Sequence, residues 1–205
     1  VWPTLLSEKL DMDCLNLGKG GRGNEYISAK LIDTILSEKK EDIGLVVLMW
    51  SGWQRIDYHD IEGEWKRVVR EGPDWNIMLK YNNAHNATMK SLRYFLMAQM
   101  LLKDIPYLMM QGVGGHDRVG RIHPHKDIWI QTFLNSKIFD EIDEKKFIGW
   151  PIMREIGGYN INNMLDKIDP ERNQLRVSSE DNHPNREGHK IIAQEIYNAY
   201  EKVYL

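Results

Sequence analysis

Two runs of consecutive apolar residues constrain the fold of this chain more than any other feature. Residues 45–50 follow Gly44, and residues 107–111 follow Pro106. Strands that are apolar on consecutive residues are buried on both faces, which is typical of parallel sheets flanked by helices. Helical patterns alternate with these runs. The alternation predicts an α/β domain of three α/β/α layers with a mainly parallel sheet, of the flavodoxin-like kind.

The other segments fit the same plan. We expect helices at residues 4–10, 24–35, 86–100, 127–135 and from 186 onwards, with further strands at 13–17 and 147–150. Asn24, Asn86 and Asn185 are the expected helix caps. Residues 51–85 are predicted to form a long loop region with a short helix near 64–70. The expected inward-facing residues are Ile27, Leu31, Ile35, Met89, Leu92, Leu96, Met100, Ile192, Ile196, Tyr200 and Val203.

Composition limits the classes of partner. The 205 residues suit a single domain, and a net charge of -3 gives no general attraction to nucleic acid. No apolar stretch of about 18 residues occurs, so no membrane span is expected.

The single cysteine, Cys14, lies in an apolar run and is expected to be buried. A chain without an internal disulfide is compatible with a reducing compartment, which favours the cytoplasm. A homo-oligomer remains open.

One polar segment carries the strongest indication of chemistry. Asp181 and His183 are two residues apart in the run Asp-x-His-Pro-Asn-x-x-Gly-His, directly before the last predicted helix. A histidine that acts as a general base needs an acid to fix its tautomer and to stabilise its charged form. A loop can turn both side chains towards one pocket. We therefore predict that Asp181 and His183 are a catalytic pair.

This segment resembles the acid–histidine end of the SGNH, or GDSL-type, ester hydrolases. The usual spacing in that family is Asp-x-x-His, so Glu180 is a second candidate for the acid. The family also has a strand followed by Asn-x-Gly-x-x-Gly, which resembles Asn16, Gly18 and Gly21. The resemblance implies that the backbone N–H of Gly21 helps to hold an oxyanion.

Two parts of the family pattern differ in this chain. The block Gly-x-Asn-Asp is matched only by Gly52, with Gln54 as the one amide donor nearby. The block Gly-Asp-Ser, which holds the family's nucleophile at the end of its first strand, does not occur. We expect that serine upstream of Val1. Without that strand, the inner edges of 13–17 and 45–50 would be unpaired. Ser51 is the only serine at the end of a predicted strand.

The resemblance implies a serine hydrolase that acts on an acyl or acetyl ester of a small molecule or glycan and needs no cofactor. The alternative is a non-catalytic relative that binds glycans through loop aromatics, although such residues also form a loop's own small core. The candidate aromatics are Trp53, Tyr58, Trp65, Trp75 and Tyr81. Histidines 116, 123 and 125 lie near Asp117 without a recognisable ligand spacing, so we expect no metal site.

Overall fold

The computed structural model describes residues 1–68, 80–113 and 126–205. At its centre is a parallel sheet of three strands in the order β1-β4-β5, with β1 at Val46–Trp50, β4 at Tyr107–Gln111 and β5 at Phe147–Ile148. Val46 pairs with Tyr107, and Met109 pairs with Phe147. The prediction of a parallel sheet built from the two apolar runs is confirmed.

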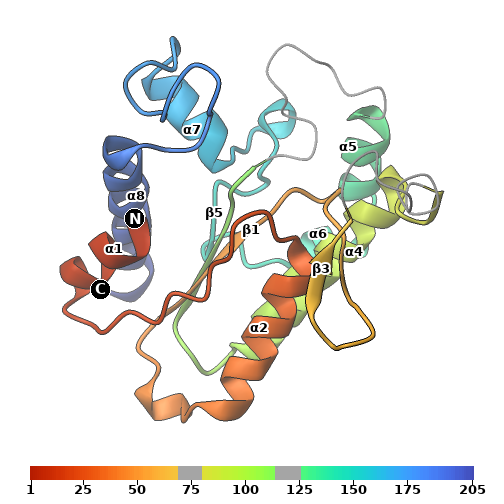
Figure 1. The fold of residues 1–205 in the computed structure, drawn as a ribbon, viewed down its shortest axis with the longest axis horizontal. Helices are drawn as coiled ribbons and strands as arrows, with labels where there is room; N and C mark the ends of the chain where they lie inside the picture. The colour runs from red at the N-terminus through yellow and green to blue at the C-terminus, as the bar shows by residue number, and fades with distance from the viewer. Residues whose placement is uncertain (69–79, 114–125) are drawn as a thin grey trace.

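Helices cover both faces of this sheet (Figure 1). One face packs against α2 (Asn24–Ser37), α4 (Ala84–Leu101), α5 (Lys126–Leu134) and α6 (Lys137–Glu141). The other packs against α1 (Trp2–Leu10), α7 (Ile161–Ile168) and α8 (Arg186–Tyr204). Two 3-10 helices, η1 (Lys40–Asp42) and η2 (Arg154–Ile156), complete the helical segments among the described residues. The arrangement is consistent with a three-layer α/β fold.

The central strand β4 shows why this layering follows from the sequence. All five of its residues are buried. Side chains alternate between the faces of a strand, so Tyr107 and Met109 join one hydrophobic cluster while Leu108 and Met110 join the other. A continuous apolar run therefore supplies both cores.

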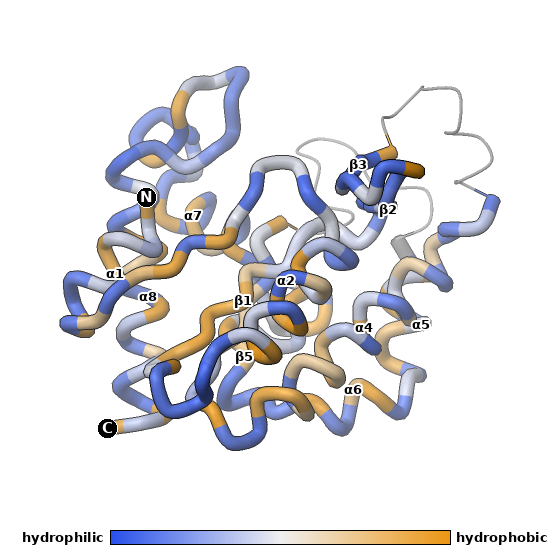
Figure 2. Tube along the Cα trace, turned by 60° about the horizontal axis from the view of Figure 1, so that its bottom comes forward, coloured by the Kyte–Doolittle hydropathy of each residue, from blue (hydrophilic) through white to orange (hydrophobic). Residues whose placement is uncertain are grey.

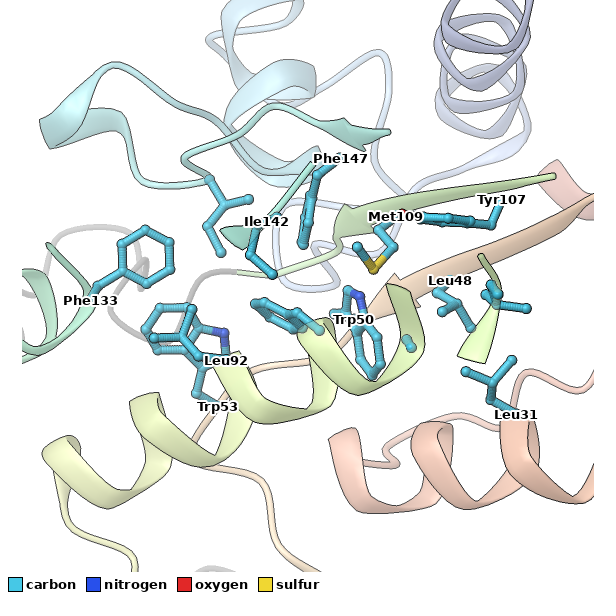
Figure 3. Packing of buried hydrophobic residues seen from close by; sticks show 14 of the residues in the cluster. Leu31, Leu48, Trp50, Trp53, Leu92, Tyr107, Met109, Phe133, Ile142 and Phe147 are labelled. Carbon is cyan, nitrogen blue, oxygen red and sulfur yellow. The ribbon is translucent and has the colours of Figure 1, made fainter. Parts of the chain in front are cut away.

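The larger cluster is rich in aromatic rings (Figure 3). Trp50 lies 5.0 Å from Phe95 between ring centroids, and Trp53 stacks on Phe133 at 5.6 Å. Trp53 is only 3% exposed. It is therefore part of the core and not a platform for sugars, in agreement with the simpler expectation for loop aromatics.

The strand predicted at residues 13–17 does not form. These residues have no regular secondary structure, and all five are exposed, including Cys14, which was expected to be buried. The physical reason is that no neighbouring strand pairs with them. In the described part of the chain, β1 pairs only with β4, so its other edge has no strand partner. The expected unpaired edge of the 45–50 strand is present.

The long segment after β1 contains a hairpin where a loop and a short helix were predicted. Strand β2 (Asp57–His59) pairs antiparallel with β3 (Trp65–Arg67), so the helix predicted near 64–70 is wrong over β3. His59 packs on Trp65 with ring centroids 4.0 Å apart. Aromatic cross-strand pairs of this kind stabilise a hairpin. Figure 2 shows the hairpin on the side of the molecule away from α1 and α8.

Most helices lie where predicted, with differences at their ends. Asn185 caps α8 as expected. The cap of α4 is Asn83 instead of Asn86, because the Asn83 side chain accepts from the Asn86 N–H at 2.9 Å. The cap of α2 is Gly23. Met100 is 67% exposed because the buried face of α4 runs through Ala87, Thr88, Ser91, Leu92, Phe95 and Ala98.

None of the helices in the described ranges is both long and apolar enough to cross a membrane.

Candidate functional site

The Asp–His motif lies on a short hairpin-like loop before α8. Arg176 and Pro184 form an antiparallel bridge across its base. The Val177 N–H donates to the His183 carbonyl at 2.9 Å, and the Ser178 N–H donates to the Asp181 carbonyl at 3.2 Å. Residues 177–183 are thus held as a closed turn by the backbone itself.

The structure brings the side chains of Asp181 and His183 together. Oδ1 of Asp181 lies 2.5 Å from Nδ1 of His183 and also accepts from the His183 backbone N–H at 3.0 Å. The backbone hydrogen bond, and then the one from the imidazole, lower the pKa of the Asp181 carboxyl. The His183 side chain is 85% exposed. In the described part of the chain no group bonds its Nε2, so this nitrogen can accept a proton from an incoming hydroxyl.

Glu180 is placed differently. Its backbone N–H donates to the Ser178 hydroxyl at 3.3 Å, and that hydroxyl also accepts from the Asp181 N–H at 2.9 Å. Among the described residues, the Glu180 carboxylate makes no hydrogen bond to His183. The geometry therefore pairs His183 with Asp181.

A buried arginine that the sequence analysis did not single out positions this loop. The Arg176 side chain is 2% exposed. Its Nη1 donates to the Asn182 carbonyl and to Asn162 Oδ1, both at 3.0 Å, and its Nη2 donates to Asp166 Oδ1 at 2.7 Å. Asn182 stands between Asp181 and His183. No motif marks Arg176, since its partners on α7 become neighbours only in the folded chain.

The rest of the motif forms the start of α8. Oδ1 of Asn185 accepts from the N–H groups of Glu187 and Gly188, both at 3.0 Å. Nδ2 of Asn185 donates to the carbonyls of Gln174 and Arg176. A Cβ at Gly188 would lie 2.5 Å from the Leu175 carbonyl oxygen, so only glycine fits there.

The glycine-rich segment has local partners of its own. The Gly18 N–H donates to Asn16 Oδ1 at 3.0 Å. Gly21 has φ 77°, and a Cβ on it would lie 2.4 Å from Arg67 Nη1. The side chain of Gln54 folds over Gly52, with Nε2 at 3.2 Å from a Cβ built there. Across the described segments, none of the four residues expected to bind an oxyanion or substrate is hydrogen-bonded to His183. These residues are Gly18, Gly21, Gly52 and Gln54.

Ser51 is held inside the fold. It is 7% exposed, and its N–H donates to Asn24 Oδ1 at 2.8 Å. Its hydroxyl accepts from Arg55 Nη1 at 2.8 Å, and its carbonyl accepts from Gln111 at 2.7 Å. No histidine of the described residues contacts this hydroxyl.

His116, Asp117, His123 and His125, for which no metal site was expected, lie outside the described residues, as does Trp75. Within residues 1–68, 80–113 and 126–205 no group of three or more His, Cys, Asp or Glu side chains could hold a metal ion. No protein family, curated protein or solved structure matches this chain in a comparison with known proteins.

Proposed function

We propose that this chain carries the acid–histidine half of a serine ester hydrolase of the SGNH kind. The observation that carries the proposal is the contact of Asp181 Oδ1 with His183 Nδ1 at 2.5 Å, beside an Nε2 that faces solvent. A carboxylate on Nδ1 fixes the tautomer in which Nε2 is the base, and it stabilises the imidazolium that forms. The same hydrogen bonds lower the pKa of Asp181 from its ordinary value of 3.8, so the pair is made with an ionised carboxylate at neutral pH. Its substrate class is an acyl or acetyl ester.

The nucleophile in this proposal is a serine on a further strand. In the described segments no serine hydroxyl is hydrogen-bonded to His183. The Ser51 hydroxyl accepts a hydrogen bond from Arg55. In residues 1–68, 80–113 and 126–205 no strand pairs with the second edge of β1. A strand edge with unpaired N–H and C=O groups is a template for another strand. A parallel strand there would end at the same edge of the sheet as β1, where α/β proteins form their sites.

The test is ester hydrolysis by the protein expressed from its complete reading frame, with p-nitrophenyl acetate as substrate. His183→Ala should lower kcat by at least about 100-fold, since general-base catalysis contributes roughly 10²–10⁴. Asp181→Asn should also lower it strongly, whereas Glu180→Gln should leave it within about 2-fold. A loss on Glu180→Gln with no loss on Asp181→Asn would assign the acid to Glu180. Unchanged hydrolysis in His183→Ala would reject the proposal.

A second candidate is a non-catalytic binding protein for glycans. The absence of a serine hydroxyl at His183 in the described segments favours it, and two of the loop aromatics, Tyr58 and Tyr81, are 41% and 66% exposed. In that case the complete protein would bind an oligosaccharide, lose binding on Tyr58→Ala or Tyr81→Ala, and hydrolyse no ester.

A further inference from the structure

Three arginines from separate segments meet at the glycine-rich loop. Arg22 is in the loop, Arg55 follows β1, and Arg67 ends β3. Nη1 of Arg55 donates to the Arg22 carbonyl at 3.2 Å. The guanidinium of Arg67 lies against Gly21. The carboxyl end of β1 is nearby, because Arg55 also donates to Ser51. The folded chain therefore gathers three positive charges that are far apart in the sequence.

Among the described residues, these charges are only partly balanced by an acid. Asp57 lies among them: Oδ1 lies 3.9 Å from Arg22 Nη1, and Oδ2 accepts from the Gly23 N–H at 2.6 Å. Oδ1 has no hydrogen-bond partner in the described structure. Two nearby acids, Glu25 and Asp60, are paired with Lys90 and Lys66. Counted over these described residues, the three arginines and Asp57 leave an excess of two positive charges.

Arg67 makes no hydrogen bond and no ion pair in the described part of the chain, although it stands directly across the hairpin from Asp57. Arg22, by contrast, donates to the Trp65 carbonyl at 2.7 Å. The pKa of Arg55 is lowered by burial and by the nearby charge of Arg67. Like charges held together in this way destabilise one another, and an anion between them would offset that cost.

The loop backbone adds further donors. The N–H groups of Gly20 and Gly21 make no hydrogen bond within the described residues, whereas the Gly23 N–H is taken by Asp57. Glycines allow a ligand to approach such N–H groups closely, and arginine forks match the oxygens of a phosphate.

We propose that Arg55 and Arg67, with the backbone of Gly20 and Gly21, bind a phosphate dianion, either as inorganic phosphate or as the phosphate group of a small organic molecule. A phosphate monoester carries close to two negative charges at neutral pH, which matches the excess of the cluster. The phosphate would contact neither Asp181 nor His183, and its binding is measured without ester hydrolysis, so the two proposals are tested separately. Gly21 is the residue that both proposals use.

The test is calorimetric titration of the complete chain with inorganic phosphate and with phenyl phosphate at constant ionic strength, with acetate as a monoanion control. Arg67→Gln, an exposed position, should raise the Kd by at least about 10-fold, since a charge-assisted hydrogen bond contributes roughly that factor. Arg55→Gln should act in the same direction. The matched control is Lys66→Gln, which removes the same charge from the neighbouring residue and should change the Kd by less than about 2-fold.

Similar affinity for both probes assigns the site to phosphate itself, and tighter binding of phenyl phosphate assigns it to an organic phosphate. No saturable binding below about 10 mM would overturn the proposal. Equal weakening by Lys66→Gln and Arg67→Gln would also overturn it, because it would mean general attraction by the surface charge.

Discussion

The guanidinium of Arg176 donates to the backbone carbonyl of Asn182 at 3.0 Å, and Asn182 is the residue between Asp181 and His183. A buried cation thereby holds the peptide that carries the proposed catalytic pair. The same guanidinium is neutralised by Asp166 on α7. The position of the Asp181–His183 turn therefore depends on contacts between α7 and the loop, and not on the motif alone.

Replacing Arg176 should destabilise the protein strongly. Arg176→Ala leaves the Asn182 carbonyl and the Asn162 side chain without this buried donor, which costs about 1–3 kcal/mol, while Asp166 keeps its pair with Arg172. Arg172→Ala is the matched control: Arg172 also pairs with Asp166, but its side chain is 23% exposed. It should cost about 1 kcal/mol or less. Urea denaturation measures both, and equal losses would contradict the role given to Arg176.

Gly188 should tolerate no side chain. A Cβ there would lie 2.5 Å from the Leu175 carbonyl oxygen, which is backbone and cannot turn away. Gly188→Ala should therefore lower the free energy of unfolding by about 1–3 kcal/mol. A Cβ at Gly20 would meet nothing within 4 Å, so Gly20→Ala should change it by no more than about 1 kcal/mol. A neutral Gly188→Ala would show that α8 does not approach this carbonyl so closely.

The contact with His183 should be visible in the titration of Asp181. The hydrogen bonds from the His183 backbone and imidazole lower the pKa of Asp181 from its ordinary value of 3.8. Because this pKa is lower in the folded state, its contribution to stability is present above the ordinary value and is lost as the pH falls through the folded pKa. NMR titration should give a midpoint below 3.8, moving back towards it in His183→Ala. A midpoint at or above 3.8 in the unaltered chain would exclude the contact.

Ser51 should prove to be a structural residue. Ser51→Ala removes the acceptor of Arg55 but no nucleophile, so p-nitrophenyl acetate hydrolysis by the complete protein should stay within about 2-fold. Loss of hydrolysis with an unchanged fold by circular dichroism would instead identify Ser51 as the nucleophile and would remove the need for a serine on another strand.

The parts of the fold that the sequence predicts well are those with strong local signals. The apolar runs that became β1 and β4 contribute side chains to the hydrophobic clusters on both faces of the sheet, and Asn185 caps α8 as its position before the helical pattern suggests. The prediction of a strand at 13–17 was wrong because a strand needs a neighbouring strand to pair with. The apolar residues of this segment do not show whether such a neighbour is present. The hairpin β2–β3 was missed because its strands are three residues each, too short for a clear alternation.

The candidate site was predictable only in part, because the sequence does not show which distant residues come into contact in the folded chain. Asp181 and His183 are neighbours in sequence, so their contact could be expected. Arg176 meets Asn162 and Asp166 only when α7 packs beside the loop. The spacing of these residues in the sequence does not predict the contact. The cluster of Arg22, Arg55 and Arg67 likewise depends on the hairpin folding back over the glycine-rich loop.

The central claim, that His183 and Asp181 activate a serine, is tested most directly by labelling the complete gene product with a fluorophosphonate and locating the modified serine by mass spectrometry. We predict one labelled serine, other than Ser51, whose labelling falls by at least about 100-fold in His183→Ala and is retained in Glu180→Gln. Absence of any labelled serine, or labelling that His183→Ala leaves unchanged, would contradict the account.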